Sequence, residues 1–96
     1  MRKLKPDPYW PVVLEQYDNL LDLYRQFEKN RPVMLFDMQE QRGYAYPYRE
    51  FSADLSKKSQ ISLATQYRNA CRDGQMVVFV RDNEARKLRS YSVPIS

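Results

Sequence analysis

The side chains that carry most enzyme chemistry are scarce in this sequence. Histidine, the commonest general base near neutral pH and the commonest metal ligand, is absent from all 96 residues. Cys71 stands alone, so the chain can form neither an internal disulfide nor a thiolate zinc site. Gly43 and Gly74 are the only glycines, which excludes a glycine-rich phosphate-binding loop. We therefore predict no catalytic residue, no metal site and no cofactor, and we expect that the chain is not an enzyme.

Two pairs of carboxylates could in principle perform acid–base chemistry. Asp18 and Asp22 are four residues apart, and a solvated helix face explains this pair much better than catalysis does. Asp37 and Asp54 flank a predicted hairpin. Asp37 directly continues an apolar strand, so we expect it to end that strand and to pair with a nearby arginine.

The residues best suited to binding are aromatic and basic. Tyr44, Tyr46 and Tyr48 alternate along one predicted strand, so their rings should lie on the same side. They are either core side chains under the helices or an exposed row. In the exposed case, three residues of a second hairpin complete the predicted interaction surface: Arg81, Arg89 and Tyr91. Aromatic rings beside arginines on a sheet are typical of proteins that bind single-stranded nucleic acid. If the tyrosines are buried instead, they belong to the core and imply no ligand.

These residues depend on elements that the apolar spacing predicts. Apolar residues at intervals of three and four indicate an amphipathic helix that stops at Asn30. An apolar strand follows over 32–38, and the alternating segment 43–51 predicts the returning strand of a hairpin. Pro47 cannot donate to a ladder, which favours an edge position for that strand.

The second half repeats this order. A helix is predicted with Asp54 or Ser56 as its N-cap and Gly74 at its C-terminal end. Its expected inward side chains are Ile61, Ala64, Tyr67, Ala70 and Cys71. Segments 75–80 and 87–93 then form a second hairpin.

Length, composition and charge complete the domain assignment. With 43% hydrophobic residues, the chain is predicted to be a small soluble protein with one α+β domain over 9–96 and a flexible basic tail over 1–8. Segments 9–53 and 54–96 form a weak pseudo-repeat. The net charge is +4, and the C-terminal segment 57–96 is basic. No apolar stretch could cross a membrane, so we expect no membrane insertion and a cytoplasmic location.

The predicted fold is α+β in the order helix–hairpin–helix–hairpin (αββαββ). We expect a four-stranded, mainly antiparallel sheet with 33–38 and 76–81 in its middle and two helices packed on one face. Strands that are apolar on both sides would then leave the other face exposed. An exposed apolar face favours a non-enzymatic protein-interaction module that forms a homodimer or docks on a larger partner through its sheet face.

The alternative function is nucleic-acid binding through the tyrosines and arginines of the sheet. A net charge of +4 with interspersed acids is smaller than most nucleic-acid-binding proteins show. The sequence indicates no small-molecule ligand. The two hypotheses differ in their salt dependence, because binding to phosphates weakens steeply as salt rises and an apolar interface hardly responds.

Overall fold

The computed structural model of the protein describes residues 7–96. The helices and strands follow one another as α1 (Trp10–Gln26), the 3-10 turn η1 (Glu28–Asn30), β1 (Val33–Asp37), β2 (Arg42–Tyr46), α2 (Tyr48–Ala53), α3 (Lys57–Asp73), β3 (Gln75–Asp82) and β4 (Lys87–Pro94). The predicted α+β class and the four-stranded sheet are confirmed. Most of the predicted tail lies outside the described residues.

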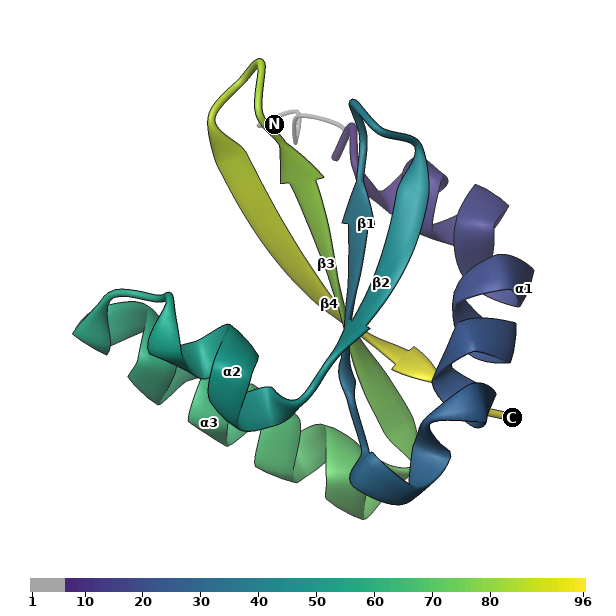
Figure 1. Cartoon of the computed structure of the whole chain (residues 1–96), viewed down its shortest axis with the longest axis vertical. Helices are drawn as coiled ribbons and strands as arrows, with labels where there is room; N and C mark the ends of the chain where they lie inside the picture. Colours follow the sequence, from purple (N-terminus) through teal and green to yellow (C-terminus); the bar gives the residue numbers. More distant parts are fainter. Residues whose placement is uncertain (1–6) are drawn as a thin grey trace, which may run out of the picture.

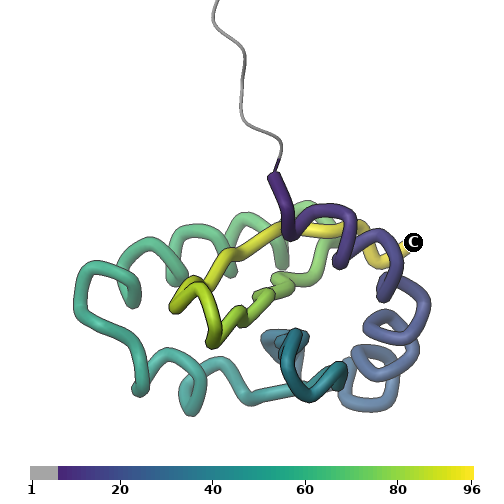
Figure 2. The backbone as a smooth tube through the Cα atoms, turned by 90° about the horizontal axis from the view of Figure 1, so that it is seen from above, coloured from purple at the N-terminus to yellow at the C-terminus, as the bar shows by residue number. Residues whose placement is uncertain are grey.

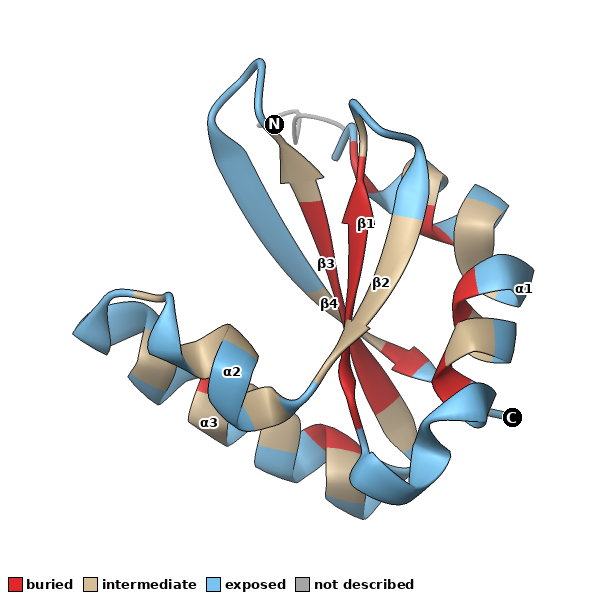
Figure 3. Cartoon of the chain, viewed as in Figure 1, coloured by how far each residue is buried: buried red, intermediate tan, exposed pale blue. Residues whose placement is uncertain are grey.

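The sheet has the strand order β2-β1-β3-β4, with the two most apolar strands at its centre (Figure 1). β1 runs parallel to β3, and each is antiparallel to its outer neighbour. The sheet is therefore mixed. The parallel centre arises because β2 returns the chain to the end of the sheet where β1 starts, and α2 and α3 then lead to β3 at that same end. All five residues of β1 are buried, as expected of a strand covered on both faces (Figure 3).

The expectation that both helices pack on one face is wrong. Met34 and Phe36 of β1 join a buried cluster with residues of α1, whereas Val33 and Leu35 join a second cluster with residues of α3. Alternate residues of one strand point to opposite faces, so α1 covers one face and α2 with α3 covers the other (Figure 2). The physical reason is that a strand apolar on both sides needs cover on both sides. The premise of an uncovered apolar sheet face is therefore contradicted.

The segment predicted as a long second strand divides into two elements. β2 ends at Tyr46, and Pro47 precedes the short helix α2. Proline lacks the N–H that a ladder needs, but its backbone angle suits the start of a helix. Tyr48, Phe51 and Leu55 follow at helical spacing and pack against the α3 cluster. Tyr48 therefore does not continue the row of Tyr44 and Tyr46 on the strand.

The ends of α3 match the prediction, and of its expected inward side chains Ala64, Tyr67, Ala70 and Cys71 are buried or half-buried, whereas Ile61 is not. Ser56 caps the helix, since its hydroxyl accepts a hydrogen bond from Ser59 N at 3.2 Å, and Gly74 ends it with a left-handed φ of 68°. Leu63 and Ala70 are buried, whereas Ile61 is 70% exposed. The reason is that α2 and the first half of α3 extend away from the sheet in Figure 1.

Candidate functional site

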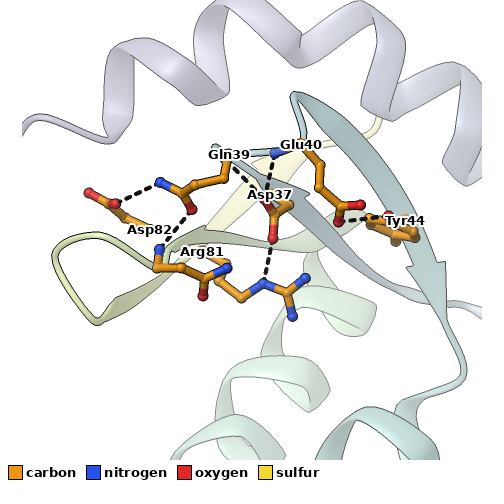
Figure 4. A network of polar contacts seen from close by, with 7 residues as sticks. Asp37, Gln39, Glu40, Tyr44, Arg81 and Asp82 are labelled. Carbon is orange, nitrogen blue, oxygen red and sulfur yellow. Dashed lines mark hydrogen bonds and ion pairs between the residues drawn. The ribbon is translucent and has the colours of Figure 1, made fainter.

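A polar network lies where the parallel strands β1 and β3 end (Figure 4). Asp37 is only 1% exposed, and its Oδ1 accepts hydrogen bonds from the backbone N–H groups of Gln39 (2.9 Å) and Glu40 (2.8 Å). Its Oδ2 pairs with Arg81 Nε at 2.7 Å. The bond from Glu40 N, together with Arg81, lowers the pKa of Asp37 despite its burial. The expected pairing of Asp37 with an arginine is confirmed.

Asp37 contacts only one edge of the Arg81 guanidinium group. Only its Nε bonds to Asp37, and within residues 7–96 neither Nη nitrogen has a hydrogen-bond acceptor. The Arg81 side chain is 38% exposed and borders a cavity of about 310 Å³. The cavity is lined by Leu35, Tyr46, Glu50, Phe51, Asp54, Leu55, Arg81 and Leu88. We call it the Arg81 cleft.

The Arg81 cleft continues into a groove between α3 and β4. Leu55 and Leu88 also line a second cavity of about 100 Å³. Ser62 and Gln66 connect that cavity to a shallow, open depression of about 520 Å³, which also contains Ile61 and Ser92. We call this cavity and the depression together the α3–β4 groove. Gln66 spans it, because its side chain bonds to both Ser90 and Ser92.

β4 forms the open edge of the sheet next to this groove. It is eight residues long, and its first half is exposed (Figure 3). Ile95 N donates to Gly74 O at 3.1 Å, in register with the β3–β4 ladder. Because inward and outward pairs alternate in an antiparallel ladder, the N–H and C=O groups of Leu88, Ser90 and Ser92 point away from β3. Edge strands with free backbone groups are sites where another strand can add.

The two elements that border the α3–β4 groove are rich in basic residues. Together α3 and β4 contain six basic side chains and a single acidic one. The bases are Lys57, Lys58, Arg68, Arg72, Lys87 and Arg89. The acidic residue, Asp73, is already paired with Arg72 at 3.0 Å. The elements that border the groove are therefore complementary to an acidic partner.

The six residues of the predicted interaction surface do not form one surface. Tyr44, Tyr46 and Tyr48 lie on the α2–α3 side and are half-buried. Tyr46 and Arg81 come together in the Arg81 cleft. Tyr91 packs in the α1 cluster on the opposite side of the sheet, and Arg89 lies on that side too, because side chains alternate along β4.

On the α1 side, aromatic side chains attach the start of the described chain to the second hairpin. Tyr91 donates to Asp7 at 2.5 Å and packs on Trp10 with ring centroids 5.3 Å apart. Burial and the bond to Asp7 raise the pKa of Tyr91. Tyr9 donates to Asp82 at 2.9 Å, and this bond lowers the pKa of Asp82. These contacts give Tyr91 a structural role on the side away from the groove.

The apolar residues of the groove were not among the site residues predicted from the sequence. Leu55, Ile61 and Leu88 become site residues only because α2 and the first half of α3 extend away from the sheet. In the structure Ile61 and Leu88 stand out because they are apolar and yet 70% and 41% exposed. In the sequence they look like ordinary core residues. The one available signal was the position of Leu88 in a strand with polar neighbours.

No protein-family model matches this chain, and comparison with curated proteins and with solved structures finds no similar protein. Among residues 7–96, no helix is long and apolar enough to span a membrane. The same residues contain no group of three or more cysteine and carboxylate side chains that could hold a metal ion. The Arg81 cleft and the α3–β4 groove are therefore the features from which we infer a function.

Proposed function

We propose that this chain is a non-enzymatic protein-interaction module that binds an extended, acidic segment of a larger partner beside β4. The segment adds to the sheet as a further strand and places alternate side chains in the α3–β4 groove. The observation that carries the proposal is the open edge of β4, which lies next to the α3–β4 groove.

The backbone of β4 supports this mode of binding. Three alternate residues, Leu88, Ser90 and Ser92, direct their N–H and C=O groups outward, and all three side chains line the α3–β4 groove. An added strand can therefore form main-chain hydrogen bonds along β4 while its side chains enter the groove. Ile61 and Leu88 provide apolar contacts for those side chains.

The charges of β4 favour an acidic partner over a second copy of this chain. β4 carries Lys87 and Arg89 and no acidic residue. Pairing β4 with its own copy would bring these bases close to the bases of the other copy. A segment with carboxylates at alternate positions would instead meet opposite charge.

Nucleic-acid binding is less well supported. Base stacking needs open aromatic faces, but Tyr48 stacks on Tyr67 with ring centroids 4.4 Å apart. Tyr46 lies between Tyr44 and Phe51, at 5.9 Å from each ring. The helices α2 and α3 thus cover much of the surface on which bases would stack.

A peptide that alternates glutamate and valine over the eight-residue length of β4 tests the proposal. Fluorescence anisotropy of the labelled peptide should show saturable binding that weakens as salt rises. Ser90→Pro removes an outward N–H, and edge strands tolerate proline at such positions. We expect Ser90→Pro to weaken binding by roughly tenfold relative to Ser90→Ala, which loses the same hydroxyl group but keeps the N–H.

Three results would contradict the proposal. Equal affinity for a peptide with lysine in place of glutamate would refute the charge argument. Tighter binding of a single-stranded oligonucleotide than of the acidic peptide would favour the nucleic-acid alternative. A dimer in light scattering that Ser90→Pro dissociates would show that the chain pairs with itself at β4.

A further inference from the structure

We propose that the Arg81 cleft is a binding site for a monocarboxylate that carries an apolar body. At about 310 Å³, the cleft is at the lower end of the range of roughly 300–1,000 Å³ that is typical of small-ligand sites. It lies at the carboxyl ends of the parallel strands β1 and β3, which is where open sheets commonly bind ligands. This inference does not depend on strand addition at β4.

The guanidinium group of Arg81 is positioned before any ligand arrives. Asp37 is buried and is itself fixed by backbone N–H groups of the β1–β2 turn, so its bond to Arg81 Nε orients the guanidinium plane. The two Nη nitrogens keep their donors, and two parallel N–H donors match the two oxygens of a carboxylate. A ligand that binds there loses little freedom in the protein side chain.

The remaining surface of the cleft is largely apolar. Leu35 is buried at its base, and Phe51, Leu55 and Leu88 surround it from α2, the α2–α3 connection and β4. An apolar body attached to the carboxylate would cover these side chains and release water from them. A carboxylate without such a body, for example acetate, should bind much more weakly.

Two acidic side chains on the rim determine the charge of the ligand. Glu50 and Asp54 are exposed and line the same cleft as Arg81, whose charge Asp37 already partly neutralises. A dianion such as a phosphate monoester would be repelled by these carboxylates more strongly than a monoanion. The cleft therefore accommodates the single charge of a carboxylate better than the two charges of a phosphate group.

Titration of the isotope-labelled protein with 3-phenylpropionate, followed by NMR, tests the site. We expect saturable shifts of the Arg81 Nε–Hε signal and of the Leu35 and Leu88 methyl signals. The amide 3-phenylpropionamide, which has the same apolar body, should cause much smaller shifts. Arg81→Lys keeps the charge but loses the paired donors, and it should weaken binding by roughly tenfold. Equal shifts with the acid and the amide, or unchanged binding by Arg81→Lys, would overturn the inference.

A second variant tests the site without replacing Arg81, so the pairing of Arg81 with Asp37 stays intact. Glu50→Gln removes a rim charge from an exposed position, so it should tighten binding of 3-phenylpropionate by about twofold to fivefold. Glu15→Gln, which makes the same change on exposed α1, should leave the affinity unchanged. A weaker or unaltered affinity of Glu50→Gln would contradict the proposed role of the rim.

The carboxylate could belong to a free acid or to an acidic side chain of a partner segment. If the glutamate–valine peptide displaces 3-phenylpropionate, the Arg81 cleft receives a side chain of the segment that pairs with β4. If both bind together, the cleft is a separate site for a free acid. Either result supports the carboxylate site, and Ser90→Pro should affect only the peptide.

Discussion

Ser90 on β4 donates a hydrogen bond from its Oγ to Oε1 of Gln66 on α3, at 2.9 Å. The amide nitrogen of the same Gln66 side chain reaches Ser92 Oγ at 3.3 Å, so one side chain bridges two alternate residues of the edge strand. α3 is thereby attached to β4 while the outer backbone groups of β4 stay free. The α3–β4 groove is consequently formed before a partner binds.

Replacing Asp37 should destabilise the fold. Asp37→Asn removes the charge that pairs with Arg81 in a buried position, and we expect the free energy of unfolding to fall by about 1–3 kcal/mol. Solvent reaches the Arg81 side chain, so the loss should be smaller than for a fully buried pair. Urea denaturation measures it, with Asp18→Asn on the exposed side of α1 as the control.

The same variant should change the response to acid. The bond from Glu40 N and the pairing with Arg81 lower the pKa of Asp37 below its ordinary value of 3.8. The carboxylate therefore stabilises the fold above pH 3.8 and loses this effect as the pH falls through its lower pKa in the folded protein. Asp37→Asn should show a shallower loss of stability below about pH 4 than the unmodified protein. Parallel curves for the two proteins would contradict this assignment.

Tyr67 should make the fold sensitive to base. Burial raises the pKa of Tyr67 from 10.0 to about 12, and its hydroxyl donates to Arg31 O at 2.7 Å. A neutral Tyr67 stabilises the fold fully below pH 10, and this contribution is lost as the pH rises from 10 toward 12. Tyr67→Phe should therefore be less stable at neutral pH, yet lose less stability over that interval. Circular dichroism at increasing pH checks this, and equal slopes would disprove it.

Tyr46 distinguishes a packed aromatic residue from an exposed binding row. Its ring packs between Tyr44 and Phe51 and is half-buried. Tyr46→Ser should lower the free energy of unfolding by about 1–3 kcal/mol, because it removes apolar contacts. The exposed Arg42→Ser on the same strand should have a small effect. Unchanged stability of Tyr46→Ser, together with lost oligonucleotide binding, would restore the hypothesis of an exposed tyrosine row.

The arrangement of the strands was predictable because their composition reports their surroundings. Segments 33–37 and 76–80 are apolar at every position except Asp37, and such strands lie at the centre of a sheet. The same pattern implies cover on both faces. Which face each helix covers depends on the connection between the central strands. Residue types alone do not reveal that β1 and β3 are parallel.

The site was less predictable than the fold. Alternation over Tyr44, Tyr46 and Tyr48 suggested a single strand, although Pro47 and the spacing of Tyr48 to Phe51 also fit the start of a helix. The pairing of Asp37 was expected, but identifying Arg81 as its partner needs the register between β1 and β3. The α3–β4 groove depends on the angle between α3 and the sheet, which no local sequence pattern encodes.

Amide hydrogen exchange of β4, measured by NMR with and without the glutamate–valine peptide, tests strand addition most directly. Ser90 and Ser92 direct their N–H groups outward, whereas the N–H groups of Arg89 and Tyr91 point toward β3. If the peptide adds to β4 as a strand, it should slow exchange at Ser90 and Ser92 and hardly alter it at Arg89 and Tyr91. Unchanged exchange at Ser90 and Ser92 at a saturating peptide concentration would contradict strand addition.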